Sequence, residues 1–249
     1  VKGQPVSTFY SYRFIGLSPV DGGPLFDDYS EQVDLLKNLN KYETFTTVLK
    51  PTGKRDPSMS GSVYNNFIWK RFRANLTLAY SLGAKLRQSR ILAQRPADDE
   101  NRFIYSEFNA NRALLNRWKA PGDEKNTIIP AIIGTNQPGY YAYNRHWTQQ
   151  GGYEGIIFAE TAWDMYDYCD ARVVSGNYLK CSNVSVAYVL PEKWLKTVRI
   201  SRFEATLSAT NLFTVCSKKL KGQTPTQSVF SQVQLSDRPT ISLGFNVSF

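Results

Sequence analysis

The first candidate for catalysis is His146, the single histidine, because an imidazole can act as a general base near neutral pH. It stands beside Trp147, and nothing near it marks a nucleophile. No G-x-S-x-G nucleophile elbow occurs in the chain. Glycosidase chemistry needs a placed pair of carboxylates, and no motif marks such a pair among the 21 acidic residues. The sequence therefore predicts that the chain is not an enzyme.

Metal chemistry has one candidate set, the three aspartates Asp164, Asp167 and Asp170, which recur at helical spacing. Calcium takes six to eight oxygen ligands, and no loop with glycine and alternating acids accompanies these residues. We expect them on a solvated loop surface, with no metal and no cofactor. The three cysteines form no CxxC pattern, and the sequence leaves undecided whether Cys169 and Cys181 form a disulfide.

Ligand binding has weak candidates in a cluster of aromatic residues. Such rings stack on sugars in binding proteins, and they also pack loops together. The net charge of +9 is scattered along the chain and forms no basic stripe, so nucleic acid is not an expected partner. The aromatic cluster consists of Tyr140, Tyr141, Tyr143 and Trp147.

Alternation of apolar and polar residues with a period of two is the strongest pattern in the chain. In residues 240–249 every odd position is apolar and every even position is small or polar, which indicates a strand with one apolar face. Five further segments alternate similarly, the last two less regularly: 72–82, 183–190, 203–210, 61–69 and 5–16. The pattern predicts about six antiparallel strands near the length that crosses a membrane at a tilt.

The predicted strands are joined by connections that alternate between short and long. Only Lys70 and Arg71 separate residues 61–69 from residues 72–82, which predicts a two-residue hairpin with Trp69 opposite Phe72. The connection after Leu190 is also short. Long loops are expected at about 17–60, 84–177 and 216–238.

Short turns at one end of a sheet and long loops at the other are typical of bacterial outer-membrane barrels, whose long loops are extracellular. Four aromatic residues, Trp69, Phe72, Trp194 and Phe249, fall near the short-turn end. They could form the periplasmic aromatic girdle that contacts the lipid bilayer, or they could cap a soluble core. We therefore classify the chain as all-β, an antiparallel transmembrane β-barrel segment with long extracellular loops.

The chain also resembles a known family, in segments that occur in the family's order. These segments are residues 12–26, residues 65–72, Arg117-Trp118 with Pro121-Gly122-Asp123 and Pro130, Tyr166-Asp167 with residues 170–174, and residues 176–180, 183–191, 211–213 and 243–249. The ordered set resembles the C-terminal part of SusC/RagA-type TonB-linked outer-membrane transporters. Arg71 stands where that family often has glycine in the hairpin.

The resemblance implies a function as well as a fold. Such transporters are plugged barrels of about 22 strands in the outer membrane of Gram-negative bacteria, and they import oligosaccharides or peptides. Residues 1–249 would form the C-terminal barrel wall and outer loops. The implied partners are the N-terminal barrel and plug portion, TonB acting through that portion, a SusD-like surface lipoprotein and the barrel-assembly machinery. In this reading Phe249 is the assembly signal that the machinery recognises.

A second hypothesis remains open, a soluble β-sandwich that binds carbohydrate through loop aromatics, since sandwich strands also alternate apolar and polar residues. No apolar stretch reaches the roughly 18–20 residues that a transmembrane helix needs. The chain begins at Val1 with no signal-peptide pattern, which is compatible with a processed protein or with a piece of a longer one.

Overall fold

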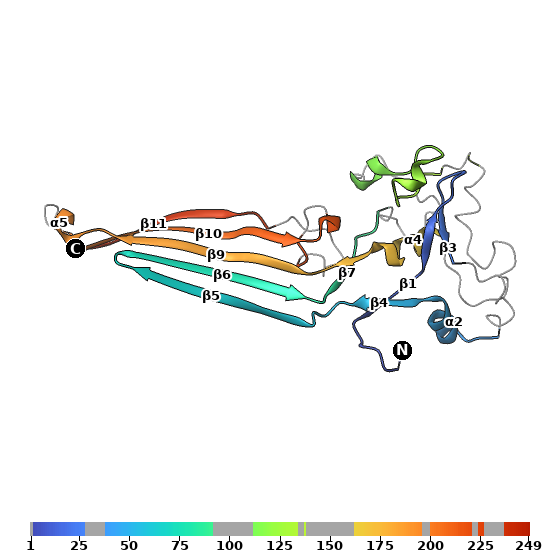
Figure 1. Cartoon of the computed structure of the whole chain (residues 1–249), viewed down its shortest axis with the longest axis horizontal. Coiled ribbons are helices and arrows are strands. Elements are labelled where there is room, and N and C mark those ends of the chain that lie inside the picture. Colours follow the sequence, from blue (N-terminus) through green and yellow to red (C-terminus); the bar gives the residue numbers. More distant parts are fainter. Residues whose placement is uncertain are drawn as a thin grey trace. The chain divides into compact units, whose positions relative to one another are not determined.

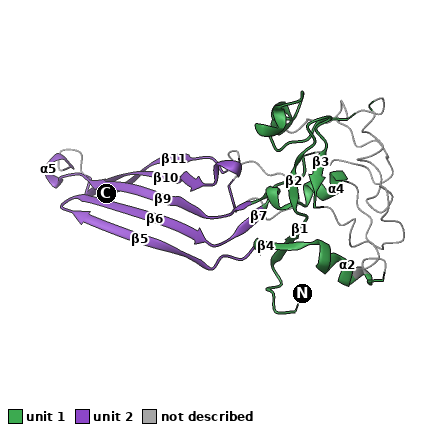
Figure 2. Ribbon diagram, turned by 45° about the vertical axis from the view of Figure 1, so that its right-hand side comes forward, with its two compact units in different colours: residues 1–53, 87–173 green, residues 54–86, 174–249 purple. Residues whose placement is uncertain are grey.

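The computed structural model of the chain divides into two compact units, which Figure 2 colours separately. Unit 1 comprises residues 1–53 and 87–173, and unit 2 comprises residues 54–86 and 174–249. The structure describes residues 2–27, 38–91, 112–133, 137, 162–195, 200–220, 224–226 and 237–249.

Unit 2 is built around a five-stranded antiparallel sheet with the order β11-β10-β9-β6-β5 (Figure 1). Its strands are β5 (Met59–Trp69), β6 (Phe72–Leu82), β9 (Tyr178–Val189), β10 (Arg202–Cys216) and β11 (Thr240–Ser248). Five of the segments with period-two alternation therefore form one sheet, as predicted, and the alternation places the apolar residues of each strand on one side of that sheet. The all-β antiparallel class is confirmed.

Residues 5–16 do not add a sixth strand to this sheet. They form β1 (Thr8–Ser11) and the start of β2 (Phe14–Leu17), which pair with β4 (Lys50–Lys54) and β3 (Pro24–Phe26) in two separate two-stranded sheets. The break falls at Tyr12, whose side chain is buried and whose backbone bridges to Cys169. Packing of this tyrosine in the core of unit 1 thus divides the alternating segment.

Two bulges interrupt the long sheet near its middle. The β6–β9 register shifts between Thr77 and Leu78, and the β9–β10 register shifts between Thr210 and Phe213. Asn211 lies in the second shift with a φ of 53°, a left-handed conformation that asparagine adopts more readily than most residues. The shift in β9 brings Leu179 into register with Tyr80, so apolar residues stay aligned beyond the bulge.

The predicted long loops contain short elements of their own. Helix α2 (Lys41–Val48) begins with a capping box, in which Asn40 accepts from the Glu43 backbone and Glu43 accepts from the Asn40 backbone. None of the helices in the described ranges is long and apolar enough to cross a membrane. The other elements are β7 (Lys85–Arg87) paired with β8 (Val173–Ser175), η2 (Arg112–Asn116), η3 (Asp123–Lys125), α4 (Ala162–Asp167), η5 (Asp170–Arg172), α5 (Glu192–Leu195) and η7 (Lys218–Leu220).

The buried cores explain why these loop elements hold together. One cluster in unit 1 joins Tyr12, between β1 and β2, to α2 and α4, and a second cluster joins the end of β2 to the segment that follows η2 and to α4. The first cluster contains Tyr12, Val48, Met165, Tyr166 and Cys169, and the second contains Leu17, Trp118, Ala131, Ile133 and Trp163. Unit 2 has a small cluster of its own beside the long sheet, made of Leu86, Val174 and Leu220.

Candidate functional site

The register of the five-stranded sheet gathers the apolar residues on one face, here called the apolar face. Because paired residues in an antiparallel sheet project to the same side, each row of partners is a row of side chains. One row runs Trp69, Phe72, Tyr188, Ala205 and Phe245. The next row runs Phe67, Ala74, Val186, Leu207 and Leu243.

The apolar face is exposed, although it carries large hydrophobic side chains. Leu207 is 53% exposed, and Leu243 and Phe245 are each 63% exposed, while Leu76 nearer the middle of the sheet is half-buried. A β-sandwich would bury such a face against a second sheet. A contiguous exposed apolar surface of this kind marks a surface that contacts a partner or a membrane.

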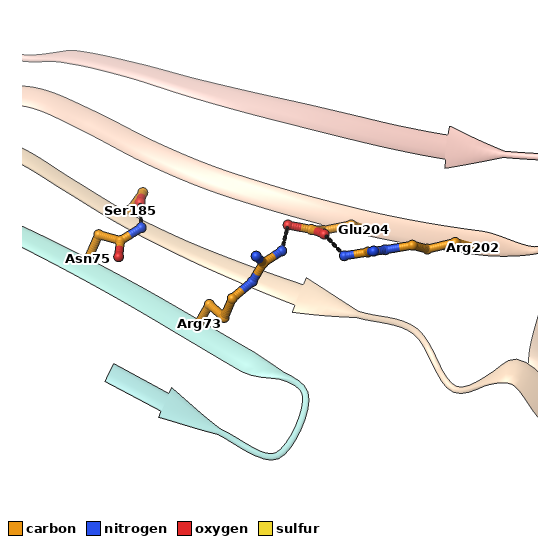
Figure 3. Close-up of polar contacts among 5 residues, drawn as sticks. All are labelled: Arg73, Asn75, Ser185, Arg202 and Glu204. Atoms are coloured by element: carbon orange, nitrogen blue, oxygen red, sulfur yellow. Dashed lines mark hydrogen bonds and ion pairs between the residues drawn. The ribbon is translucent and has the colours of Figure 1, made fainter. Parts of the chain in front are cut away.

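The opposite face, here called the polar face, carries hydrogen-bonding side chains in register. Asn75 Nδ2 donates to Ser185 Oγ at 3.3 Å (Figure 3), and the Tyr64 hydroxyl donates to Asn75 Oδ1 at 3.1 Å. Asn75, Ser185, Ser208 and Ser242 follow one another across four strands. Part of the polar face is thus hydrogen-bonded within the sheet, and its small polar side chains suit contact with water.

A charged cluster lies on the polar face near the β5–β6 turn. The Arg73 guanidinium on β6 reaches across β9 to Glu204 Oε1 on β10 at 2.5 Å, and Arg202 Nη2 donates to Glu204 Oε2 at 2.8 Å (Figure 3). Ala187 is the β9 partner of Arg73, and its small side chain leaves room for the arginine to cross. One carboxylate between two guanidinium groups leaves this cluster with a net positive charge.

The aromatic residues predicted to form a girdle gather at one end of the sheet. The antiparallel order places the Lys70-Arg71 turn, helix α5 and the end of β11 at that end, as Figure 1 shows. The rings of Trp69 and Phe72 stack with centroids 6.2 Å apart. Trp194 on α5 and Phe249 after β11 are both exposed. Their roles in the girdle and in assembly stay predictions.

The weak ligand-binding candidates Tyr140, Tyr141, Tyr143 and Trp147 lie outside the described residues, as does His146. The three aspartates are described, and the carboxylates of Asp170 and Asp167 accept backbone hydrogen bonds within unit 1. Asp170 Oδ1 accepts from the Phe14 backbone at 3.1 Å, and Asp167 Oδ1 accepts from the Ile91 backbone at 3.3 Å. No metal-ligand cluster of three or more such residues occurs in the part of the chain that the structure describes.

Asp167 is not on a solvated surface, contrary to the prediction, because it pairs with a buried arginine. Arg172 is almost fully buried, its Nε lies 3.6 Å from Asp167 Oδ1, and its Nη2 donates to the Ser89 carbonyl. Burial raises the pKa of Asp167, while the Arg172 charge opposes the rise. The Arg172 guanidinium also lies 5.2 Å from the centroid of the Tyr166 ring. The sequence analysis did not predict the ion pair between Asp167 and Arg172. The one sign of it in the sequence was that both residues lie in a segment that resembles the transporter family.

The cysteines are not joined in a disulfide: Cys169 and Cys181 are buried, and Cys216 is half-buried. The bridge between Cys169 and Cys181 that the sequence left open is therefore absent. Burial raises the pKa of the Cys169 thiol to about 11, so this thiol is protonated at neutral pH.

Comparison with known proteins shows what fold these elements share. No protein-family model and no curated protein sequence matches the chain. A structure of the RagAB peptide importer in the "open-open" state aligns with 100% of this chain and 24% of that chain, with 17% identity and a TM-score of 0.56. A structure of the RagAB peptide transporter aligns with 97% of this chain and 23% of that chain, with 18% identity and a TM-score of 0.58.

A third structure, of the RagAB peptide importer in the "closed-closed" state, aligns over 97% of this chain with 16% identity and a TM-score of 0.55. At such identities the similarity shows a shared fold. The chain spans about a quarter of the length of these structural neighbours.

Proposed function

We propose that the chain forms part of the wall and the outer loops of a SusC/RagA-type, TonB-dependent transporter in the outer membrane of a Gram-negative bacterium. The observation that carries the proposal is the exposed apolar face of the five-stranded sheet, backed by a hydrogen-bonded polar face. The apolar face contacts the hydrocarbon of the bilayer, and the polar face lines a wet interior. Strands β5, β6 and β10, at 11, 11 and 15 residues, are long enough to cross a membrane at a tilt.

In this function the sheet belongs to a larger barrel. Lipid does not tolerate unpaired strand edges, and β5 and β11 form the edges of this sheet. Bacterial barrels have at least about eight strands, so strands from another part of the protein pair with these edges. A plug portion inside the barrel, TonB and a SusD-like surface lipoprotein complete the proposed transporter.

The proposed cargo is a peptide or an oligosaccharide. The structural neighbours are peptide importers by name, and their fold is the one this chain shares, which favours peptide. Oligosaccharide stays with the proposal because other members of the resembled family import it. The test is uptake of a labelled peptide mixture and a labelled oligosaccharide mixture by cells with and without the protein, and by cells that lack TonB. If cells with and without the protein took up both mixtures equally, the transport function would be contradicted.

The membrane orientation of the sheet is tested with neighbouring residues on β11. Leu243 lies on the apolar face and Ser242 on the polar face, and both are exposed. Lysine at a lipid-facing position costs up to about 2–4 kcal/mol at the bilayer midplane and less toward the interfaces, whereas a lysine facing water costs little. We expect Leu243→Lys to lower the amount of full-length protein in the outer-membrane fraction severalfold and Ser242→Lys to leave it near the wild-type level. Equal levels of the two variants would contradict the orientation.

The soluble-sandwich alternative makes the opposite prediction for the wild-type protein. A carbohydrate-binding module of that kind would remain in the supernatant after membranes are sedimented. We expect the wild-type protein in the membrane pellet, released by detergent and not by high salt, because its attachment is hydrophobic.

A further inference from the structure

A cavity of about 220 Å³ lies at the β5–β6 turn and is lined by Trp69, Lys70, Arg71, Phe72 and Tyr188. We call it the turn-end cavity. Three of its residues belong to one row of the apolar face, and the other two are the residues of the turn itself. It therefore combines an apolar wall with two cationic side chains.

The wall of the turn-end cavity is a continuous aromatic surface. The Phe72 ring lies 4.6 Å from the Tyr188 ring and 6.2 Å from the Trp69 ring, measured between centroids. Trp69 and Phe72 are both exposed, so this surface is open to a ligand. Aromatic rings with one apolar side and one wet side suit the boundary between hydrocarbon and lipid headgroups.

The two cations at the cavity are available to bind an anion. Lys70 and Arg71 are exposed, and neither forms an ion pair with an acidic residue in the described ranges. Lys70 Nζ lies 5.1 Å from the centroid of the Trp69 ring, which holds the ammonium group above the aromatic wall.

The backbone fixes these cations beside the rings. Lys70 has a φ of 52°, and Trp69 pairs directly with Phe72, so the turn is as tight as two residues allow. The Val189 backbone donates to the Arg71 carbonyl at 3.0 Å, which ties the turn to β9. The turn backbone is therefore formed before any ligand arrives, and only the Lys70 and Arg71 side chains need to be ordered on binding.

We propose that the turn-end cavity binds the phosphate headgroup of a glycerophospholipid in the leaflet at the short-turn end of the barrel. Lys70 and Arg71 bind the phosphate oxygens, and the glycerol and upper acyl chain lie on Trp69, Phe72 and Tyr188. Free phosphate could use the two cations, but it has no apolar part for the three rings. This inference rests on the proposed membrane function, and it adds a lipid-specific site to it.

The test measures retained lipid on the full-length protein, purified in a neutral detergent and titrated with phosphatidylglycerol, using native mass spectrometry. The variant is Lys70→Asn with Arg71→Gln, because asparagine tolerates the left-handed backbone of residue 70. We expect the first phosphatidylglycerol to bind about tenfold more weakly, consistent with the loss of two charge-assisted contacts. Arg71→Gln alone, which leaves Lys70 in place, should weaken binding by a smaller factor and serves if the double variant does not assemble.

The matched control is Lys193→Gln, which removes an exposed cation from α5 at the same end of the sheet but outside the cavity. Its lipid binding should equal that of the wild type. Diacylglycerol, which lacks phosphate, should not compete with phosphatidylglycerol.

Three results would overturn the assignment: equal lipid binding by the wild type and the cavity variants, equal losses in the cavity variants and the control, or full displacement of the lipid by millimolar inorganic phosphate. The last result would identify a simple anion site. Each of them leaves the membrane function intact if the protein still sediments with membranes. A protein found in the soluble fraction would instead refute the membrane function itself.

Discussion

The indole of Trp118 occupies the space that a side chain on Gly22 would fill. A Cβ atom on Gly22 would lie 2.3 Å from Trp118 Cδ2, and the φ of Gly22 is 70°, so both space and backbone favour glycine. The Ala131 backbone donates to the Gly22 carbonyl at 3.0 Å. Two segments that are distant in sequence, residues 12–26 and the segment around Arg117-Trp118, are thus packed against each other in unit 1.

Replacement of Gly22 tests this packing. Gly22→Ala must strain the left-handed backbone, at about 1–2 kcal/mol, and must also displace the indole, at about 1–3 kcal/mol. Gly122→Ala is the matched control, because Gly122 has a φ of 105° with nothing within 4 Å of its Cβ position. We expect thermal unfolding of the purified protein at a lower temperature for Gly22→Ala than for Gly122→Ala. Equal shifts would mean that Trp118 does not restrict this position.

In the turn between β5 and β6, replacement by glycine should change the stability of the protein in opposite directions at the two neighbouring residues. Lys70 has a φ of 52° and Arg71 is not among the residues with positive φ, so glycine relieves strain only at position 70. We expect Lys70→Gly to stabilise the protein by about 1 kcal/mol and Arg71→Gly to destabilise it by about 0.5–1 kcal/mol. Unfolding in urea, with the protein in detergent, measures both. Stabilisation by Arg71→Gly alone would contradict the turn geometry.

The Arg73–Glu204 pair contributes modestly to stability if the polar face is wet. The Arg73 side chain is 44% exposed and the Glu204 side chain 13% exposed, so water reaches the pair from the arginine side. Solvent-exposed pairs are typically worth about 0.2–1 kcal/mol. A double-mutant cycle with Arg73→Gln and Glu204→Gln should give a coupling energy in that range, and it should fall as salt is raised. A coupling above about 3 kcal/mol would indicate a dry environment and would contradict a water-lined face.

The cysteines predict a pattern of chemical labelling. Because burial raises the pKa of Cys169 to about 11, its thiolate is scarce at pH 8, and its alkylation by iodoacetamide should be far slower than that of half-buried Cys216. The rate at Cys169 should rise about tenfold per pH unit towards pH 11, since only the thiolate reacts. Peptide mass spectrometry reports each site. In denaturant all three cysteines should react, and rapid labelling of Cys169 in the folded protein would refute its burial.

The hairpin at residues 59–82 shows how far the sequence alone could go. Its pairing follows from two local facts, the alternation of apolar residues and a gap of only Lys70 and Arg71, and the observed register of Trp69 with Phe72 confirms it. A shift of one residue would turn every side chain to the other face, so the pattern fixes the register.

The same reasoning failed for residues 5–16 and for Asp167, because long-range packing decided both. Alternation predicts a strand but does not identify its partner, and burial of Tyr12 divided this one between two small sheets. The absence of a calcium-loop pattern around the three aspartates predicted a solvated loop surface. Instead, the turn through η5 brings Arg172 back to Asp167, and the two form an ion pair. Nothing in the sequence around Asp167 or around Arg172 reveals that these two charged side chains are buried.

The sequence by itself determined the strands, their apolar faces and the tight turn, because these depend on backbone periodicity and on neighbouring residues. Only the tertiary structure decided that the apolar face stays exposed and that the β9–β10 pairing shifts register at Asn211. It also decided that Tyr188 of β9 completes the turn-end cavity beside the residues of the β5–β6 turn. These features depend on which strands pair and on what covers each face, and pairing between distant segments is set by packing that no local pattern encodes.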